Sequence, residues 1–295
     1  MPYVTVRDVP HYYEWIASSE PMSSEKPVMV FLHGWAGSAR YWRSTAEALK
    51  PVFNCLLYDL RGFGRSKEPA RDRTASITPQ TAWEHYNLET YADDLAALLA
   101  ELKLGPVYLN AHSTGASIAA LFLNRYPEQA IEAILTCNGI FEYDEKAFGQ
   151  FHQFGGYAVK FRPQWLAKIP GIDRMFMARF LHRSIPRSER VAFLDDFLMA
   201  DEAAALGTMF TAVSKQAAET MPQEFARVQV PTLLVSGEFD RIIPAEMGRQ
   251  AAELNESTIE FCVIPQTGHF PMLEDPEGYL NCVTRFLERS PKRSR

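Results

Sequence analysis

The alternation of short apolar runs with segments of helical spacing is the feature that most constrains how this chain can fold. Pro27–His33 and Phe53–Asp59 are apolar almost throughout, as strands buried on both faces of a parallel sheet must be. Asn87–Lys103 instead gathers its leucines on one side of a helix that Asn87 is suited to cap. Strands that alternate with helices predict an α/β fold, in which helices cover both faces of a parallel sheet.

The alternation begins after a β-hairpin that we expect at residues 3–17, and it continues to the end of the chain. Further strands are predicted at Pro106–Asn110, Ile131–Cys137, Val230–Ser236 and Ile259–Ile264, and further helices at Ser38–Leu49, Ser113–Tyr126, Ala245–Leu254 and Pro276–Arg289. A smaller irregular insertion is expected at Thr74–Tyr86.

One long segment interrupts this rhythm. Residues 140–221 hold no convincing buried strand, are helical in composition and are broken by Pro163, Pro170 and Pro186. We interpret them as a helical cap inserted between two strands, where it would lie over a site. The core then comprises residues 1–139 and 222–295. Extra helices that pack on the sheet away from any site are the alternative.

Composition excludes several classes of protein. Of the 295 residues 47% are hydrophobic, which is ample for a packed core and argues against disorder. A formal net charge of −6 gives no general attraction to nucleic acid. No apolar stretch approaches the ~20 residues that span a bilayer, and the first ten residues do not have the pattern of a secretory signal. We therefore expect a cytoplasmic protein.

The cysteine and histidine patterns give no sign of a metal site. The four cysteines form no C-x-x-C pair. Cys55, Cys137 and Cys262 lie in predicted strands, and we interpret them as small buried hydrophobic residues in a reducing compartment. The histidines outside the motifs described below show no metal-ligand spacing. We expect neither a metal nor a cofactor.

The strongest local motif centres on Ser113. It lies between a predicted strand and a predicted helix, and Ala111 and Gly115 stand two positions before and after it. A sharp strand-to-helix turn needs small residues at these two positions, because larger side chains would clash where the chain doubles back. The turn lifts the serine hydroxyl clear of the sheet, beside a helix N-terminus that favours developing negative charge.

A second motif, His33-Gly34-Trp35, ends another predicted strand. The glycine lets the backbone approach a reacting carbonyl closely. A backbone N–H group of this turn and that of Thr114 are therefore candidate donors to an oxyanion, each worth roughly 3 kcal/mol of transition-state stabilisation.

Two further motifs supply an acid and a base. Asp240 and His269 each follow a predicted strand, and with Ser113 they occur in the order nucleophile, acid, base. Open α/β sheets place their ligands at the carboxyl ends of the strands. An imidazole can take the proton of a serine hydroxyl, and a carboxylate fixes the tautomer of that imidazole and stabilises its charged form. We expect Ser113, Asp240 and His269 to be catalytic.

Five segments together resemble the α/β-hydrolase superfamily over nearly the whole chain. They are His33–Gly37, Asp59–Ser66, Ala111–Gly115, Gly237–Asp240 and Gly268–Phe270. The resemblance implies a doubly wound, mostly parallel sheet of about eight strands with a helical cap. It also implies a catalytic Ser113, Asp240 and His269, with Trp35 and Thr114 as oxyanion donors. The motif around Ser113 opens with Ala111 where glycine is commoner, but alanine is still small.

The predicted cap is both basic and aromatic. Between Lys146 and Arg190, nine Lys and Arg residues stand against two acids, Asp173 and Glu189, which is a formal charge of +7. One interpretation is solvated helix faces over an aromatic inner face. The other is a weak contact of the basic cap with an anionic membrane or acidic headgroups, while the aromatic residues line a bulky apolar pocket. The candidate pocket residues are Phe148, Phe151, Phe154 and Trp165.

A serine nucleophile argues against haloalkane dehalogenases and epoxide hydrolases, which this cap arrangement otherwise resembles but which use an aspartate. We expect a serine hydrolase that cleaves a small-molecule carboxylic ester with a hydrophobic acyl or alcohol part. A C–C bond hydrolase or lyase, an aminopeptidase-like amide hydrolase and a ligand receptor without turnover stay open as alternatives. The substrate itself and the oligomeric state do not follow from the sequence.

Overall fold

The computed structural model describes residues 2–19, 25–67 and 85–289. The predicted insertion at Thr74–Tyr86 lies outside the described residues, apart from its last two positions.

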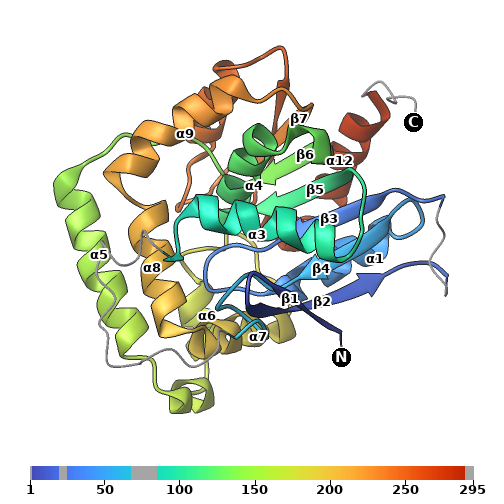
Figure 1. The fold of residues 1–295 in the computed structure, drawn as a ribbon. Helices are drawn as coiled ribbons and strands as arrows, with labels where there is room; N and C mark the ends of the chain where they lie inside the picture. The colour runs from blue at the N-terminus through green and yellow to red at the C-terminus, as the bar shows by residue number, and fades with distance from the viewer. Residues whose placement is uncertain (1, 20–24, 68–84, 290–295) are drawn as a thin grey trace.

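An eight-stranded sheet forms the centre of the molecule (Figure 1). Its spatial order is β1 (Tyr3–Val6), β2 (Val9–Ile16), β4 (Asn54–Tyr58), β3 (Val28–Leu32), β5 (Val107–His112), β6 (Ala130–Thr136), β7 (Thr232–Gly237) and β8 (Ile259–Ile264). The hairpin of β1 and β2 pairs antiparallel to β4, and all pairs from β4 to β8 are parallel. The predicted mostly parallel sheet is confirmed.

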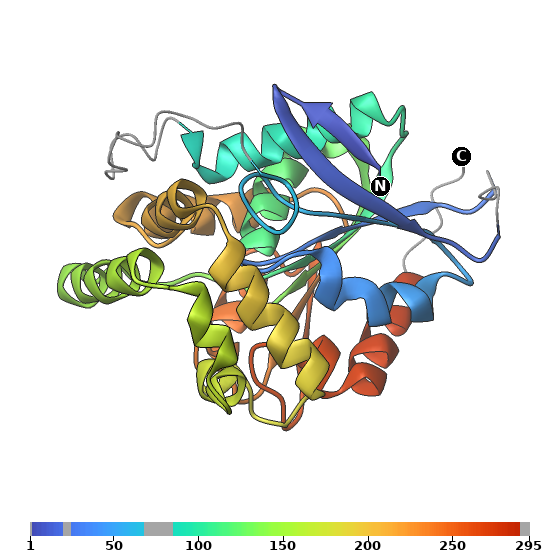
Figure 2. The same cartoon turned by 90° about the horizontal axis from the view of Figure 1, so that it is seen from below.

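The central strands are apolar throughout because helices cover both of their faces. Val30 and Leu56 belong to one buried cluster and Phe31 and Leu57 to the other, as the alternation of side chains along a strand requires. The first cluster takes in α3 (Leu88–Glu101), α4 (Thr114–Arg125), α9 (Lys215–Arg227) and α10 (Ala245–Glu253), and the second α1 (Arg43–Leu49) and α12 (Pro276–Arg289). Figure 2 shows these two layers on either side of the sheet.

The chain between β6 and β7 contains helices and no strand. It forms α5 (Glu145–Lys160), η3 (Gln164–Lys168), α6 (Ile172–Met177), α7 (Arg187–Met199) and α8 (Glu202–Ala212) before α9. The predicted boundary at residues 221 and 222 falls inside α9, where Phe225 is buried in the core and Asn124 of α4 donates to the carbonyl of Glu224. We therefore propose that α5–α8 form the cap and that α9 belongs to the core.

Short 3-10 and helical turns complete the connections. They are η1 (Ala39–Trp42), η2 (Pro127–Gln129) and α11 (Pro271–Glu274). Within the described part of the chain, no helix combines the length and the apolar character that a membrane crossing requires.

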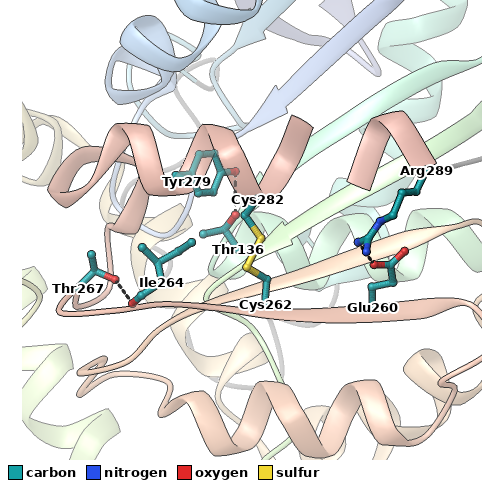
Figure 3. The surroundings of a disulfide bond; sticks show 8 residues. All are labelled: Thr136, Glu260, Cys262, Ile264, Thr267, Tyr279, Cys282 and Arg289. Carbon is teal, nitrogen blue, oxygen red and sulfur yellow. Dashed lines mark hydrogen bonds and ion pairs between the residues drawn. A yellow bond between two sulfur atoms is a disulfide. The ribbon is translucent and has the colours of Figure 1, made fainter. Parts of the chain in front are cut away.

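A disulfide bond joins the last strand to the last helix. Cys262 on β8 is bonded to Cys282 on α12, as Figure 3 shows. The interpretation of Cys262 as a buried hydrophobic residue is therefore wrong, whereas Cys55 and Cys137 are free and buried as expected. The prediction failed because the partners lie on different elements, which only the packing of α12 against β8 brings together. Because disulfides are rare in reducing compartments, the cysteines no longer support the prediction of such a compartment. The cytoplasmic location stays a prediction.

Candidate active site

The turn between β5 and α4 holds Ser113 in a conformation that few residues adopt. Its φ of 54° and ψ of −123° lie outside the helical and extended regions. Gly115 is required because an added Cβ would lie 2.5 Å from the carbonyl oxygen of His33. Ala111 is fully buried in β5 between β3 and β6. The small residues that the sequence places around Ser113 are thus the ones that the sharp turn needs.

Ser113, His269 and Asp240 lie together, although the first and the last of them in the chain, Ser113 and His269, are 156 positions apart. Nε2 of His269 lies 3.1 Å from Oγ of Ser113. Nδ1 of the same ring lies 2.7 Å from Oδ2 of Asp240, and both side chains are buried. Because the carboxylate accepts from Nδ1–H, Nε2 is left without a proton and can accept the one on the serine hydroxyl.

Asp240 is held as a carboxylate. Its second oxygen accepts from the backbone N–H groups of Ile242 and Ile243, at 2.7 and 3.1 Å. Burial alone would raise the pKa of Asp240, but His269 and these two N–H groups outweigh it and hold the pKa below its ordinary value. The charge that orients His269 therefore persists throughout the neutral range.

The turn after β3 lies directly against the nucleophile. A Cβ added to Gly34 would be 3.1 Å from the Cβ of Ser113. Trp35 follows in this turn, and its indole Nε1 donates to the carbonyl of Ala205 on α8 at 2.9 Å. Thr114 opens α4, where the first N–H groups of a helix have no acceptor within the helix. The backbone N–H groups of Trp35 and Thr114 thus belong to two turns that meet at Ser113.

A buried chain of hydrogen bonds joins these turns to the loop that carries His269. The N–H of Gly34 donates to the hydroxyl of Tyr41 at 2.5 Å, and this hydroxyl lies 3.0 Å from Nδ1 of His112. Nε2 of His112 lies 2.7 Å from the carbonyl oxygen of His269. A carbonyl only accepts, so Nε2 carries the proton and Nδ1 accepts from Tyr41. Burial, reinforced by the nearby His269, holds the pKa of His112 well below its ordinary value, so the ring is neutral.

Glu274 on α11 fixes the loop of His269 from its other side. One carboxylate oxygen accepts from the N–H groups of Gly268 and Phe270, at 3.0 and 3.2 Å. The other accepts from His182 and Arg183 in the cap, each at 2.7 Å. The N–H of His269 itself donates to the carbonyl of Phe180 at 2.7 Å. Hydrogen bonds therefore join the loop of His269 in the core to the cap. No sequence motif indicated this connection.

The cap also contacts the core through a buried acid. Asp196 on α7 accepts a hydrogen bond of 2.5 Å from the hydroxyl of Ser38, and its other oxygen lies 3.3 Å from the guanidinium of Arg40. Burial raises the pKa of Asp196 to about 6, against an ordinary value of 3.8. The protonation state of this cap residue therefore changes in the mildly acidic range.

The four aromatic residues expected to line a pocket lie elsewhere. Phe148 packs against the rings of Phe141 and Tyr143. Phe151, Phe154 and Trp165 are exposed, by 48%, 70% and 55%. Among the described residues, no ring contact or hydrogen bond joins these four side chains to Ser113, His269 or Asp240. The structure does not bring them to the reacting atoms.

Other cap aromatics lie near His269. The ring of Phe180 is 6.1 Å from the imidazole. A continuous series of ring contacts runs from Phe180 to Trp35 through Phe193, Phe176 and Phe197. We therefore reassign the aromatic lining of the site to α6, α7 and the segment between them. The sequence contained these phenylalanines, but their spacing does not say which face of the cap they occupy.

One group of side chains has the composition of a metal site. The ligand atoms of His112, Cys137 and His269 all lie within 4.8 Å of one another. Both ring nitrogens of each histidine already make a hydrogen bond, however. Burial also raises the pKa of Cys137 well above its ordinary value, which disfavours the thiolate that binds metals. The donor set therefore does not fit a metal.

Two residues of the motif segments, Asp59 and His33, hold turns through hydrogen bonds to backbone N–H groups. Asp59 accepts from the backbone N–H groups of Ala39 and Arg65, each at 2.8 Å, and so holds the turn after β4. The ring of His33 accepts from the N–H of Leu60 at 2.9 Å. Both side chains are fully buried.

Comparison with known proteins places this chain in a family. Residues 27–276 match the family model described as alpha/beta hydrolase fold. The chain belongs to the alpha/beta hydrolase fold family. It is therefore a hydrolase of that fold, and the resemblance seen in the five sequence segments is confirmed.

Similar alpha/beta hydrolases cover nearly the full length of the chain. The AB hydrolase superfamily protein YisY of Bacillus subtilis is 26% identical over 281 residues, which are 90% of this chain and 93% of the relative. Among solved structures, a thermophilic esterase from Thermogutta terrifontis is 22% identical with a TM-score of 0.72, covering 98% of each chain. The enol-lactonase from Burkholderia xenovorans LB400 is 18% identical with a TM-score of 0.74, covering 98% of this chain and 100% of its own. These two likenesses are of fold alone.

Proposed function

We propose that this hydrolase cleaves a carboxylic ester with a hydrophobic acyl or alcohol part through an acyl-enzyme on Ser113. The observation that carries the proposal is the pair of contacts made by His269, 3.1 Å to the serine hydroxyl and 2.7 Å to Asp240. This arrangement supports proton transfer from the hydroxyl to a neutral imidazole whose charged form the carboxylate then stabilises.

In the first half of the reaction, Ser113 attacks the ester carbonyl while His269 takes its proton. The carbonyl oxygen becomes negative as the bond forms, and the N–H groups of Trp35 and Thr114 stabilise that charge. His269 then passes the proton to the leaving alcohol. In the second half, His269 takes a proton from water, which attacks the acyl group and releases the acid while the proton returns to Ser113.

The hydrophobic part of the substrate is assigned to the aromatic series between Phe180 and Trp35. Phe193 and Phe197 are buried, and Phe176 and Phe180 are partly exposed, so the series offers apolar surface beside His269. Burying apolar surface of the substrate there contributes about 25 cal/mol per Å². This aromatic lining supports an apolar group in the substrate.

The test is hydrolysis of p-nitrophenyl esters with acyl chains of two to sixteen carbons, with Ser113→Ala as the control. We expect turnover that depends on Ser113 and a chain-length optimum that moves toward shorter acyl chains in Phe197→Trp, which adds volume to the lining. If the folded wild-type protein hydrolyses none of these esters but a fluorophosphonate still labels Ser113, the bond that the enzyme cleaves would be a C–C bond or an amide. Failure of that labelling would favour a receptor without turnover.

A further inference from the structure

Exposed apolar side chains are concentrated on one part of the cap. Of the thirteen large hydrophobic side chains that the described residues expose, eight lie between Tyr143 and Met175. We define the outer face of the cap by seven of them: Phe151, Phe154, Tyr157, Phe161, Trp165, Ile169 and Met175. Single exposed hydrophobic residues are normal on a protein surface, whereas a cluster of this kind marks an interaction site.

Helix α5 has two apolar faces with different environments. The inner face packs on α8: a Cβ added to Gly155 would be 2.6 Å from the sulfur of Met209, and His152 contacts the ring of Phe210. At 100° per residue, Phe151, Phe154 and Phe161 fall within one arc on the opposite side. There Phe154 is 70% and Phe161 76% exposed. Figures 1 and 2 show α5 at the edge of the molecule, with α8 between it and the core.

The segment that carries these side chains is basic as well as apolar. Lys160, Lys168, Arg174 and Arg179 are exposed, and none forms an ion pair within residues 2–19, 25–67 and 85–289. From Lys146 to Arg183 the sequence contains a single acid, Asp173. That acid is buried, and Arg190 binds it at 2.9 Å, so it does not offset the exposed cations.

We propose that the outer face of the cap binds peripherally to an anionic membrane surface. Trp and Phe side chains enter the boundary between headgroups and acyl chains favourably, and nearby Lys and Arg are attracted to anionic lipid. Long basic side chains can keep their charges at headgroup level while their stems lie along apolar surface. A second copy of this chain is a poorer occupant, because two such faces would bring like charges together.

This binding goes beyond the proposed ester hydrolysis and does not depend on it. The part of the outer face that α5 carries, with Phe151 and Phe154, lies on the side of this helix opposite to the one that packs on α8. Attachment through it would leave the aromatic series beside His269 available to substrate. Phe151, Phe154 and Trp165, which sequence analysis assigned to a pocket, thus belong to a different surface from the aromatic series assigned to the substrate.

The test is co-sedimentation with phosphatidylcholine vesicles that contain, or lack, one third phosphatidylglycerol. We expect binding only to the anionic vesicles and a decline at raised salt. Lys168→Gln/Arg174→Gln/Arg179→Gln should weaken it on the order of a hundredfold, because each cation near such a surface contributes about 1 kcal/mol, or roughly fivefold. Phe154→Ser/Phe161→Ser should weaken it about tenfold or more, since two buried rings are lost.

Matched controls change similar residues away from the cap. Val52→Ser/Leu254→Ser removes two exposed apolar side chains, and Arg285→Gln removes an exposed arginine of α12. Both controls should bind as the wild type does. Absence of wild-type binding, or equal losses in variants and controls, would overturn the proposal. So would a dimer in analytical ultracentrifugation that Phe154→Ser/Phe161→Ser dissociates. Turnover of a short-chain ester without vesicles is measured in parallel, so that failure of the chemistry is seen separately.

Discussion

The ring of His112 donates from Nε2 to the backbone carbonyl of His269, across 2.7 Å. The residue before Ser113 thus holds the backbone of the residue whose ring contacts the Ser113 hydroxyl. Because Nδ1 of the same ring accepts from Tyr41, which in turn binds Gly34, three separate turns of the site share one buried chain of hydrogen bonds.

Tyr41→Phe tests this chain. Removal of the hydroxyl leaves the N–H of Gly34 and Nδ1 of His112 without their partner, at about 1–3 kcal/mol for each buried group. Because both groups lie beside the oxyanion turn, we expect kcat to fall about tenfold or more while KM changes little. Steady-state kinetics on one ester measures both constants. Tyr279→Phe is the control, since that hydroxyl is equally buried but binds Asn110 and Thr136. An equal fall of kcat in the two variants would mean that the Tyr41 hydroxyl has no specific effect on the reaction.

Asp240→Asn tests the acid of the proposed triad. An amide can donate to Nδ1 and so favours the tautomer with the proton on Nε2, where it opposes removal of the proton from Ser113. We expect kcat to fall by a factor on the order of 10⁴, as for the equivalent change in a serine protease triad. Circular dichroism checks that the variant is folded. A fall of less than tenfold in a folded variant would remove Asp240 from the mechanism.

Asp196→Asn tests the buried acid of the cap. The pKa of Asp196 is about 6 in the folded protein against 3.8 ordinarily, so the folded state holds the proton more tightly than the unfolded state. Stabilisation by the protonated group is complete below pH 3.8 and is lost as the pH rises to about 6. Two pKa units correspond to about 3 kcal/mol.

We expect Asp196→Asn to remove this decline in the free energy of unfolding between about pH 4 and pH 7. Denaturant titrations at both values measure it. Asp195→Asn, a change of the neighbouring and less buried acid, should leave the pH dependence as in the wild type. An unchanged decline in Asp196→Asn would show that other groups cause it.

Reduction of the disulfide tests the link between β8 and α12. The bond closes a loop with a sequence separation of 20 residues, for which loop-closure entropy predicts a loss of about 3 kcal/mol in unfolding free energy on reduction. Denaturant midpoints with and without reductant measure it. The double variant Cys262→Ser/Cys282→Ser should show the lower midpoint in both conditions. A wild-type midpoint that reductant does not change would mean that the bond does not contribute to stability.

The sequence allowed the strands, and the meeting of Ser113, Asp240 and His269 at one edge of the sheet, to be predicted because both depend on short-range patterns. Asn87 caps α3 through a hydrogen bond to the N–H of Thr90, as its position suggested. Ser113, Asp240 and His269 follow β5, β7 and β8, and the carboxyl ends of parallel strands meet at one edge of a sheet. The aromatic faces of the cap were not predictable in this way. Phe148 and Val159 face inward from α5, whereas Phe151 and Phe154 face outward, so the helix is apolar on both sides.

The groups that hold the site escaped prediction for a related reason. Glu274 and Tyr41 accept hydrogen bonds from backbone N–H groups. Almost any residue can supply a backbone N–H, so such a bond leaves no motif in the sequence. The disulfide depends on which helix lies over β8. Such relations arise only when distant segments are packed together, as Figure 3 shows for Cys262 and Cys282.

The cap is one continuous stretch of sequence between β6 and β7. Residues of the cap and residues of the core are therefore encoded in separate parts of the gene. Ser113, Asp240 and His269 are encoded outside the cap, and the phenylalanines assigned to substrate and the outer face within it. Evolution, or an engineer, can therefore replace the cap to change selectivity or attachment while keeping the reaction. At the loop of His269, any replacement must reproduce a carbonyl where Phe180 receives the N–H of His269, and the two N–H groups that Glu274 binds.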